Sequence, residues 1–98
     1  CTWAAFDWAE ALSLCEPGGA AALWASGATR VDGDLPINPS GGVLCTNPIG
    51  ATGLIRVAEA SMQVRGTAGE RQVDGVRTAL TTGFGGSFWN EVMILGVR

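Results

Sequence analysis

The feature that most constrains this chain is a helix start that carries two glycines. Asn47 and Pro48 are typical of an N-cap and a first helical residue, and the periodic pattern behind them predicts a helix over 48–65. Gly50 and Gly53 fall in its first turns, where each glycine costs roughly 1 kcal/mol relative to alanine. The simplest compensation is the close approach of another backbone or of a ligand. The apolar positions of this helix share one side and are Leu54, Val57, Ala58, Ser61 and Met62.

The other expected elements are shorter. In chain order they are helices over 2–14 and 20–26, a segment over 28–42 that is mostly loop, and strands over 73–82 and 88–97. A glycine-rich turn over 83–86 joins the two strands, which predicts an antiparallel hairpin at the C-terminal end. The apolar run over 92–95 predicts that the second strand is buried on both faces.

Composition excludes several classes of protein. The 98 residues allow one domain, and 47% apolar residues with 15% charged ones exclude disorder. A net charge of −3 makes the chain a poor partner for nucleic acid or an anionic membrane, and no apolar stretch is long enough to span a bilayer. The absence of histidine removes the commonest general base of enzymes.

The cysteines indicate neither a disulfide framework nor a metal site. Cys1, Cys15 and Cys45 are odd in number and lack the spacing of metal ligands, so we interpret them as reduced thiols of a cytoplasmic protein. The large excess of apolar over charged residues is typical of a piece of a larger core. We therefore expect residues 1–98 to be a fragment of a longer chain.

Four motifs together resemble the C-terminal domain of thiolases, in order and spacing across nearly the whole chain. They are Asn38–Gly42 (NPSGG), Thr46–Gly53 (TNPIGATG), Ala68–Val73 (AGERQV) and Gly83–Gly86 (GFGG). The nearest branch is that of the sterol-carrier-type thiolases, lipid-transfer proteins and acetyl-CoA acetyltransferases. The resemblance implies an α/β fold in which residues 1–98 form part of the layered α-β-α thiolase C-terminal domain, ending in an antiparallel hairpin.

Asn47 is the catalytic candidate that the resemblance singles out. Members of the family usually carry histidine at this position, in a Gly-His-Pro motif. An asparagine amide also donates a hydrogen bond to a carbonyl oxygen, and the start of a helix favours a polarised carbonyl. The resemblance therefore implies that Asn47 binds the thioester oxygen in an oxyanion hole. The alternative is that its side chain caps the helix, and the two roles compete for one amide.

Other residues would complete this site. The positions expected to bind substrate are Gly42, Pro48, Gly50, Gly83, Phe84 and Gly85. Gly83 stands where the family has its second catalytic cysteine, so that acid is absent. A flexible hairpin turn is the alternative for this stretch.

Cys45 is a candidate acid–base group, with a buried structural cysteine as the alternative. We interpret Arg56, Arg65 and Arg71 as solvated residues rather than contacts to the phosphates of coenzyme A.

The resemblance implies an acyltransferase that acts on acyl-CoA thioesters in lipid or sterol metabolism. The reaction would be Claisen or retro-Claisen carbon–carbon bond formation or cleavage, with the coenzyme A thioester as substrate and no metal or other cofactor. The family's nucleophilic cysteine is not among these residues, so we expect activity in the full-length chain and none in this fragment alone.

Two alternatives stay open. One is a degenerate thiolase-like protein that binds acyl-CoA or steroid-CoA esters, or cleaves them by a retro-aldol route with an OB-fold partner subunit. The other is a purely structural dimerisation domain. The expected partners are acyl-CoA and a second copy of the full chain, and neither nucleic acid nor a membrane is expected.

Overall fold

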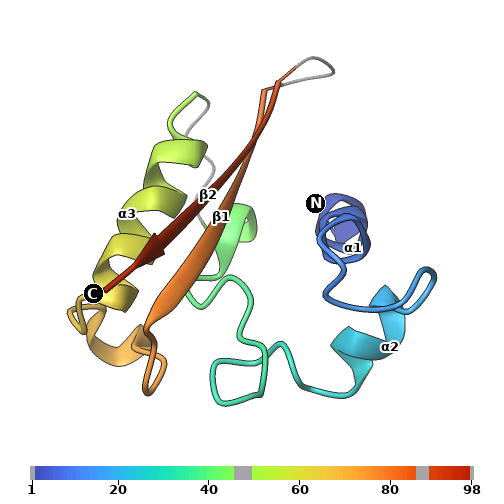
Figure 1. The fold of residues 1–98 in the computed structure, drawn as a ribbon, viewed down its shortest axis with the longest axis horizontal. Coiled ribbons are helices and arrows are strands. Elements are labelled where there is room, and N and C mark those ends of the chain that lie inside the picture. The colour runs from blue at the N-terminus through green and yellow to red at the C-terminus, as the bar shows by residue number, and fades with distance from the viewer. Residues whose placement is uncertain (1, 46–49, 86–88, 98) are drawn as a thin grey trace. The chain divides into compact units, whose positions relative to one another are not determined.

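The chain forms two compact units, residues 1–38 and 39–98, each with its own internal contacts. The computed structural model describes residues 2–45, 50–85 and 89–97. Helices α1 and α2 belong to the first unit, and helix α3 with strands β1 and β2 belongs to the second (Figure 1). No helix within the described ranges is long and apolar enough to cross a bilayer.

In the first unit, α1 (Thr2–Ala11) is shorter than the sequence predicts. Ser13 adopts a left-handed backbone with φ of 56°, and the Leu14 N–H donates to the Ala9 carbonyl at 2.8 Å. This pattern closes the helix end, so the expected continuation to Leu14 is wrong. A polar residue in the left-handed region stops the helix where apolar periodicity alone would continue it.

Helix α2 (Ala20–Ala25) ends close to the predicted position. Ser26 is its C-cap, and Gly27 follows with φ of 82°, a conformation that glycine adopts without strain. The ring centroids of Phe6 and Trp24 lie 5.1 Å apart, which joins α2 to α1. Most of the segment that follows is loop, as expected, up to the short 3-10 helix η1 (Gly42–Leu44) of the second unit.

In the second unit, α3 (Thr52–Val64) begins four residues later than predicted. Gly50 has φ of 85°, which interrupts any continuous helix before it, and Ala51 occupies the N-cap position without a side-chain hydrogen bond. The expectation that Asn47 caps this helix and Pro48 begins it is therefore wrong. Asn47 and Pro48 themselves lie outside the described residues.

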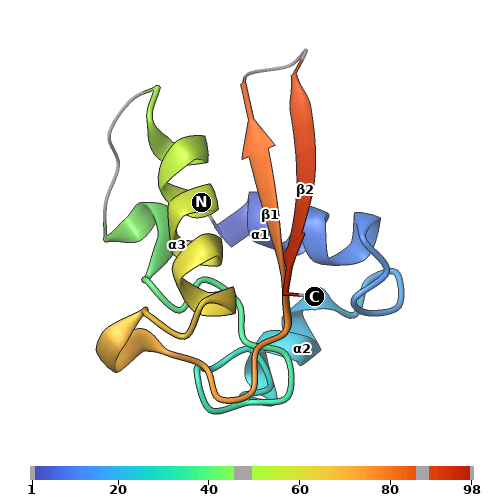
Figure 2. The same ribbon diagram turned by 60° about the vertical axis from the view of Figure 1, so that its left-hand side comes forward.

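Strands β1 (Thr78–Phe84) and β2 (Asn90–Gly96) confirm the predicted antiparallel hairpin, although β1 begins later and ends later than the strand predicted over 73–82. The register pairs Thr78 with Gly96 at one end and Phe84 with Asn90 at the other. Helix α3 packs beside this two-stranded sheet, as both ribbon views show (Figure 2). The helix, the loop and the hairpin are consistent with the α/β C-terminal domain of the thiolase fold.

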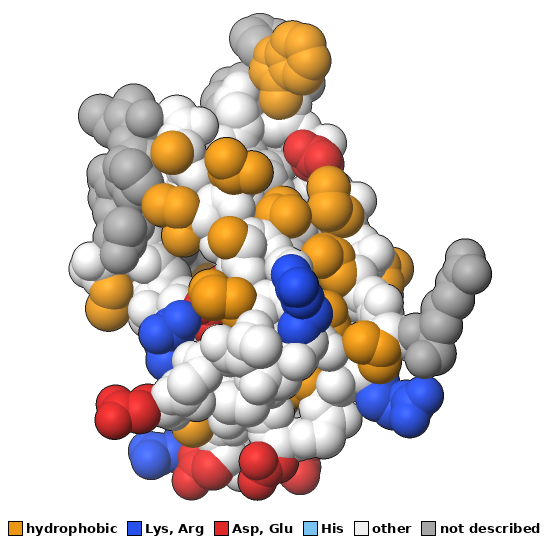
Figure 3. Space-filling view, turned by 90° about the vertical axis from the view of Figure 1, so that its left-hand side faces the viewer, with side chains coloured by type: hydrophobic (Ala, Val, Ile, Leu, Met, Phe, Trp, Pro, Cys, Tyr) orange, Lys and Arg blue, Asp and Glu red, His pale blue; other side chains and the backbone are white. Residues whose placement is uncertain are grey.

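The apolar side chains of β2 are mostly exposed, so the expectation of burial on both faces is wrong. Val92 and Ile94 are 45% and 68% exposed, and Leu95 is half-buried. Within the described ranges the sheet has two strands and α3 as its helical neighbour, which leaves apolar strand surface uncovered. Hydrophobic side chains also gather on the side of the molecule where α3 lies (Figure 3).

Candidate functional site

The start of α3 is open to solvent. Gly50 is exposed, and its φ of 85° explains why glycine stands there. A Cβ added at Gly50 or Gly53 would meet no atom of the described chain within 4 Å. The predicted close backbone neighbour is therefore not found among the described residues. Among the described residues, no side chain or backbone fills the space that a Cβ at these two positions would occupy.

Gly42 and Cys45 lie on the turn that contains η1. Gly41 and Gly42 both have positive φ, and a side chain at Gly41 would collide with the Cys45 sulfur. Cys45 is an exposed free thiol, which contradicts the alternative of a buried structural cysteine. In both ribbon views, η1 lies at the height of the middle of α3 rather than at its start (Figures 1 and 2).

Gly83 and Phe84 belong to β1 rather than to a flexible turn, which corrects that alternative. Gly83 is paired with Glu91, and Phe84 has 67% of its surface exposed. The Gly85 N–H donates to the Trp89 carbonyl at 2.9 Å. A Cβ at Gly85 would lie 3.1 Å from the Cβ of Trp89, so the pairing at this end of the hairpin favours glycine.

The structure brings two of the predicted parts to one end of the second unit. The start of α3, which follows Gly50 in the chain, and the last residues of β1, with Gly83 and Phe84, lie toward the same end in both ribbon views (Figures 1 and 2). Arg56, in the next turn of α3, reaches the residue before Gly83. Its Nη1 donates to the Thr82 carbonyl at 2.7 Å.

The buried side of α3 is polar, which the sequence analysis missed. Glu59 and Gln63 are buried there, whereas Leu54 is 73% exposed. The Gln63 amide donates to the Arg71 carbonyl at 2.7 Å and accepts the Val73 N–H at 2.9 Å. The spacing of two polar residues by one helical turn was the signal available in the sequence.

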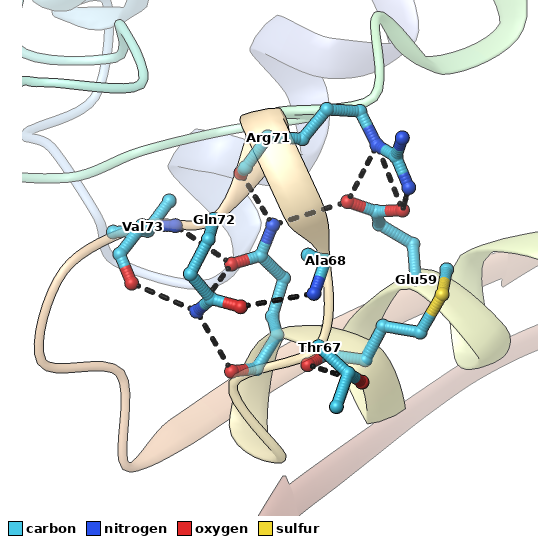
Figure 4. A network of polar contacts seen from close by, with 8 residues as sticks. Glu59, Thr67, Ala68, Arg71, Gln72 and Val73 are labelled. Atoms are coloured by element: carbon cyan, nitrogen blue, oxygen red, sulfur yellow. Dashed lines mark hydrogen bonds and ion pairs between the residues drawn. The ribbon is translucent and has the colours of Figure 1, made fainter.

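We call this set of contacts the Gln63 network (Figure 4); its members are Glu59, Gln63, Ala68, Arg71, Gln72 and Val73. The Arg71 guanidinium lies 3.0 Å from the Glu59 carboxylate. Burial opposes ionisation of Glu59, but hydrogen bonds from Arg71 and Gln63 and the charge of Arg71 outweigh it and lower the pKa of Glu59. The network holds the loop after α3 against that helix.

Two of the three arginines are therefore not simply solvated, contrary to expectation. Arg71 pairs with Glu59, and the Arg56 side chain is partly buried against β1, whereas Arg65 is exposed. Within the described part of the chain, no group of three His, Cys, Asp or Glu side chains gathers as a metal site would require.

Comparison with known proteins matches the sequence to one family. Residues 1–97 match the family described as "Thiolase C-terminal domain-like". The chain is 44% identical over 79 residues to an acetyl-CoA acetyltransferase of Methanothermobacter thermautotrophicus, and 47% identical over 81 residues to sterol carrier protein 2 of Homo sapiens. It is 38% identical over 81 residues to non-specific lipid-transfer protein-like 2 of Caenorhabditis elegans.

Each alignment covers 80% of this chain but a small part of the relative. The matched segment spans 21% of the acetyltransferase, 15% of sterol carrier protein 2 and 20% of the lipid-transfer protein. The resemblance carried by the four motifs is thus confirmed. The chain belongs to the thiolase C-terminal domain-like family.

Proposed function

We propose that this chain is the C-terminal part of an acyltransferase that acts on acyl-CoA thioesters, with Asn47 in the oxyanion hole. The observation that carries the proposal is the arrangement at the start of α3. There the left-handed Gly50 leads into the first turn of α3, where a Cβ at Gly50 or Gly53 would meet no neighbouring atom of the described residues within 4 Å, at the end of the unit where β1 terminates in Gly83 and Phe84. The 44% identity to an acetyl-CoA acetyltransferase supports this substrate class.

The proposed chemistry assigns binding and charge stabilisation to this chain. When a nucleophile attacks a thioester, negative charge develops on the carbonyl oxygen, and an amide donor such as Asn47 stabilises that charge. The nucleophile would come from elsewhere in the full-length protein. Pro48 and Gly50 would shape the site beside Asn47, and Gly42, Gly83, Phe84 and Gly85 would approach the acyl chain.

Cys45 is the second candidate for acid–base work in this proposal. Its thiol is exposed and unbridged, so it is accessible to a substrate proton. It stands two residues before Asn47 in the sequence. We assign it a lesser role than that of Asn47.

The alternative function is binding without thiolysis. The absence of histidine removes the family's usual activating group, and two of the relatives are named as a sterol carrier and a lipid-transfer protein. In that case the full protein would hold acyl-CoA or steroid-CoA esters, or cleave them by a retro-aldol route with an OB-fold partner. Homodimerisation of the full chain is part of both proposals.

The deciding experiment uses the full-length protein with Asn47→Ala and Asn47→His. Under the proposal, Asn47→Ala lowers turnover of acyl-CoA by roughly 100-fold or more while the melting temperature is unchanged, because one oxyanion donor is lost. Asn47→His supplies a donor again and restores part of the turnover. Unchanged turnover in Asn47→Ala contradicts the role of Asn47. Tight binding of acyl-CoA by a wild-type protein that never turns it over supports the alternative.

A further inference from the structure

We infer that Arg56 is a positioning residue, which fixes the end of β1 against α3 and thereby sets the placement of Gly83 and Phe84. The inference rests on the proposed function, in which those residues approach the acyl chain. Arg56 does not touch the reacting atoms in this proposal. It acts through the backbone of Thr82.

The contact joins two elements that are far apart in the sequence. Arg56 Nη1 donates to the Thr82 carbonyl at 2.7 Å, and the Thr82 hydroxyl lies 3.4 Å from the same nitrogen. Thr82 directly precedes Gly83, and Arg56 lies one helical turn after the start of α3. One side chain thus connects the two parts of the candidate site that share an end of the unit.

The register explains why the Thr82 carbonyl accepts this bond. Gly85 donates its N–H to Trp89, and Val97 donates its N–H to Arg77, which places these residues in hydrogen-bonded pairs between the strands. Pairs alternate along an antiparallel ladder, so Thr82 opposes its partner in a non-hydrogen-bonded pair. Its carbonyl therefore points away from β2, toward the side from which Arg56 donates.

The guanidinium is not otherwise satisfied within the described residues. The Arg56 Nε is buried there without an acceptor, and the described ion pairs do not include Arg56. A buried donor without a partner is rare in folded proteins and calls for an explanation. By contrast, Arg71 lies in the same unit and is paired with a carboxylate.

The test compares Arg56→Met and Arg56→Lys in the full-length protein, with Arg71→Met as the matched control. Arg56→Met keeps the apolar stem and removes the donor, so amide hydrogen exchange rises over residues 82–85, and kcat falls about 10-fold to 100-fold with little change in the acyl-CoA dissociation constant. Arg56→Lys keeps a donor, so it restores part of the protection from exchange and part of kcat. Arg71→Met lowers the melting temperature without raising exchange over residues 82–85.

The outcomes separate this inference from the proposed function. Exchange and kcat that match the wild type in Arg56→Met overturn the positioning role while the acyltransferase proposal stands. If the wild-type protein turns over no acyl-CoA, the proposed function fails, and the exchange measurement alone still decides the role of Arg56. Should Arg56→Met not fold, Arg56→Gln, whose side chain is too short to reach Thr82, carries the same expectation.

Discussion

Glu59 is a buried residue of α3, and it shows at the scale of one residue how hydrogen-bond donors stabilise an ionised carboxylate. Its two carboxylate oxygens share the single Arg71 Nε–H at 3.3 Å, Arg71 Nη2 donates at 3.0 Å, and Gln63 donates at 3.1 Å. A carboxylate that accepts several donors stays ionised in spite of burial. Removing Arg71 would leave the buried Glu59 carboxylate without its counter-charge, which is costly.

The lowered pKa of Glu59 predicts how stability depends on pH. The unfolded chain takes up a proton on this glutamate near its ordinary value of 4.5, whereas the folded chain does so at lower pH. The contribution of Glu59 to the free energy of unfolding is therefore fully present above pH 4.5. It is lost as the pH falls from 4.5 through the lower pKa that Glu59 has in the folded chain. Glu59→Gln lowers the free energy of unfolding at neutral pH and makes its decline in acid shallower. Urea denaturation at a series of pH values measures both effects.

The control for that measurement is Glu70→Gln, which changes an exposed glutamate of the adjacent turn η2 (Gly69–Arg71). We expect its pH profile to follow the wild type. Parallel profiles for wild type and Glu59→Gln would contradict the assignment of the acid-labile stability to Glu59.

At the scale of an element, α3 differs from an ordinary amphipathic helix. Its buried positions include Glu59 and Gln63 beside Ala60, and its large apolar side chains Leu54 and Ile55 are exposed. The loop that follows the helix packs against its polar side. The exposed apolar side chains could contact another surface, because contiguous exposed apolar surface commonly marks an interaction site.

The two glycines at the start of α3 make opposite predictions. Gly50→Ala lowers the free energy of unfolding by about 1–2 kcal/mol, because alanine is strained at positive φ. Gly53→Ala raises it by up to about 1 kcal/mol, because the helix gains propensity and no described atom stands in the way. Thermal unfolding of the full-length protein measures both changes.

The Gly53→Ala variant also tests the site. If a substrate approaches the first turn of α3, the more stable Gly53→Ala protein turns over acyl-CoA more slowly than the wild type. Equal or faster turnover in Gly53→Ala would count against substrate contact at this turn.

At the scale of the whole molecule, the buried apolar core is very small. Among the described residues, the buried apolar side chains are four alanines: Ala9, Ala20, Ala60 and Ala68. Large side chains such as Trp89, at 75% exposure, and Phe84 lie at the surface. Burial of this kind supplies little of the hydrophobic free energy that a domain of this length needs. That residues 1–98 are part of a larger core stays a prediction.

This prediction is tested by comparing residues 1–98 alone with the full-length protein. We expect the isolated segment to bind a hydrophobic dye strongly and to show a broad thermal transition, because its apolar surface is uncovered. The full-length protein binds little dye. A sharp cooperative transition of the isolated segment without dye binding would show instead that it is an independent domain.

The sequence by itself determined the elements and the family, because these depend on local signals. Periodicity, glycine positions and the four motifs predicted α2, the body of α3 and the hairpin in their order, together with the thiolase resemblance. Local signals placed the start of α3 too early, since they do not report that Gly50 takes a left-handed backbone.

Only the tertiary structure decided which side of α3 is buried and which groups meet across the chain. Gln63 bonds to the loop ten residues later, and Arg56 reaches Thr82, 26 residues away. Such contacts depend on how the loop and the strand return to the helix. A pattern of apolar and polar residues predicts that one side of a helix is buried, but the partner that packs against the helix selects the side.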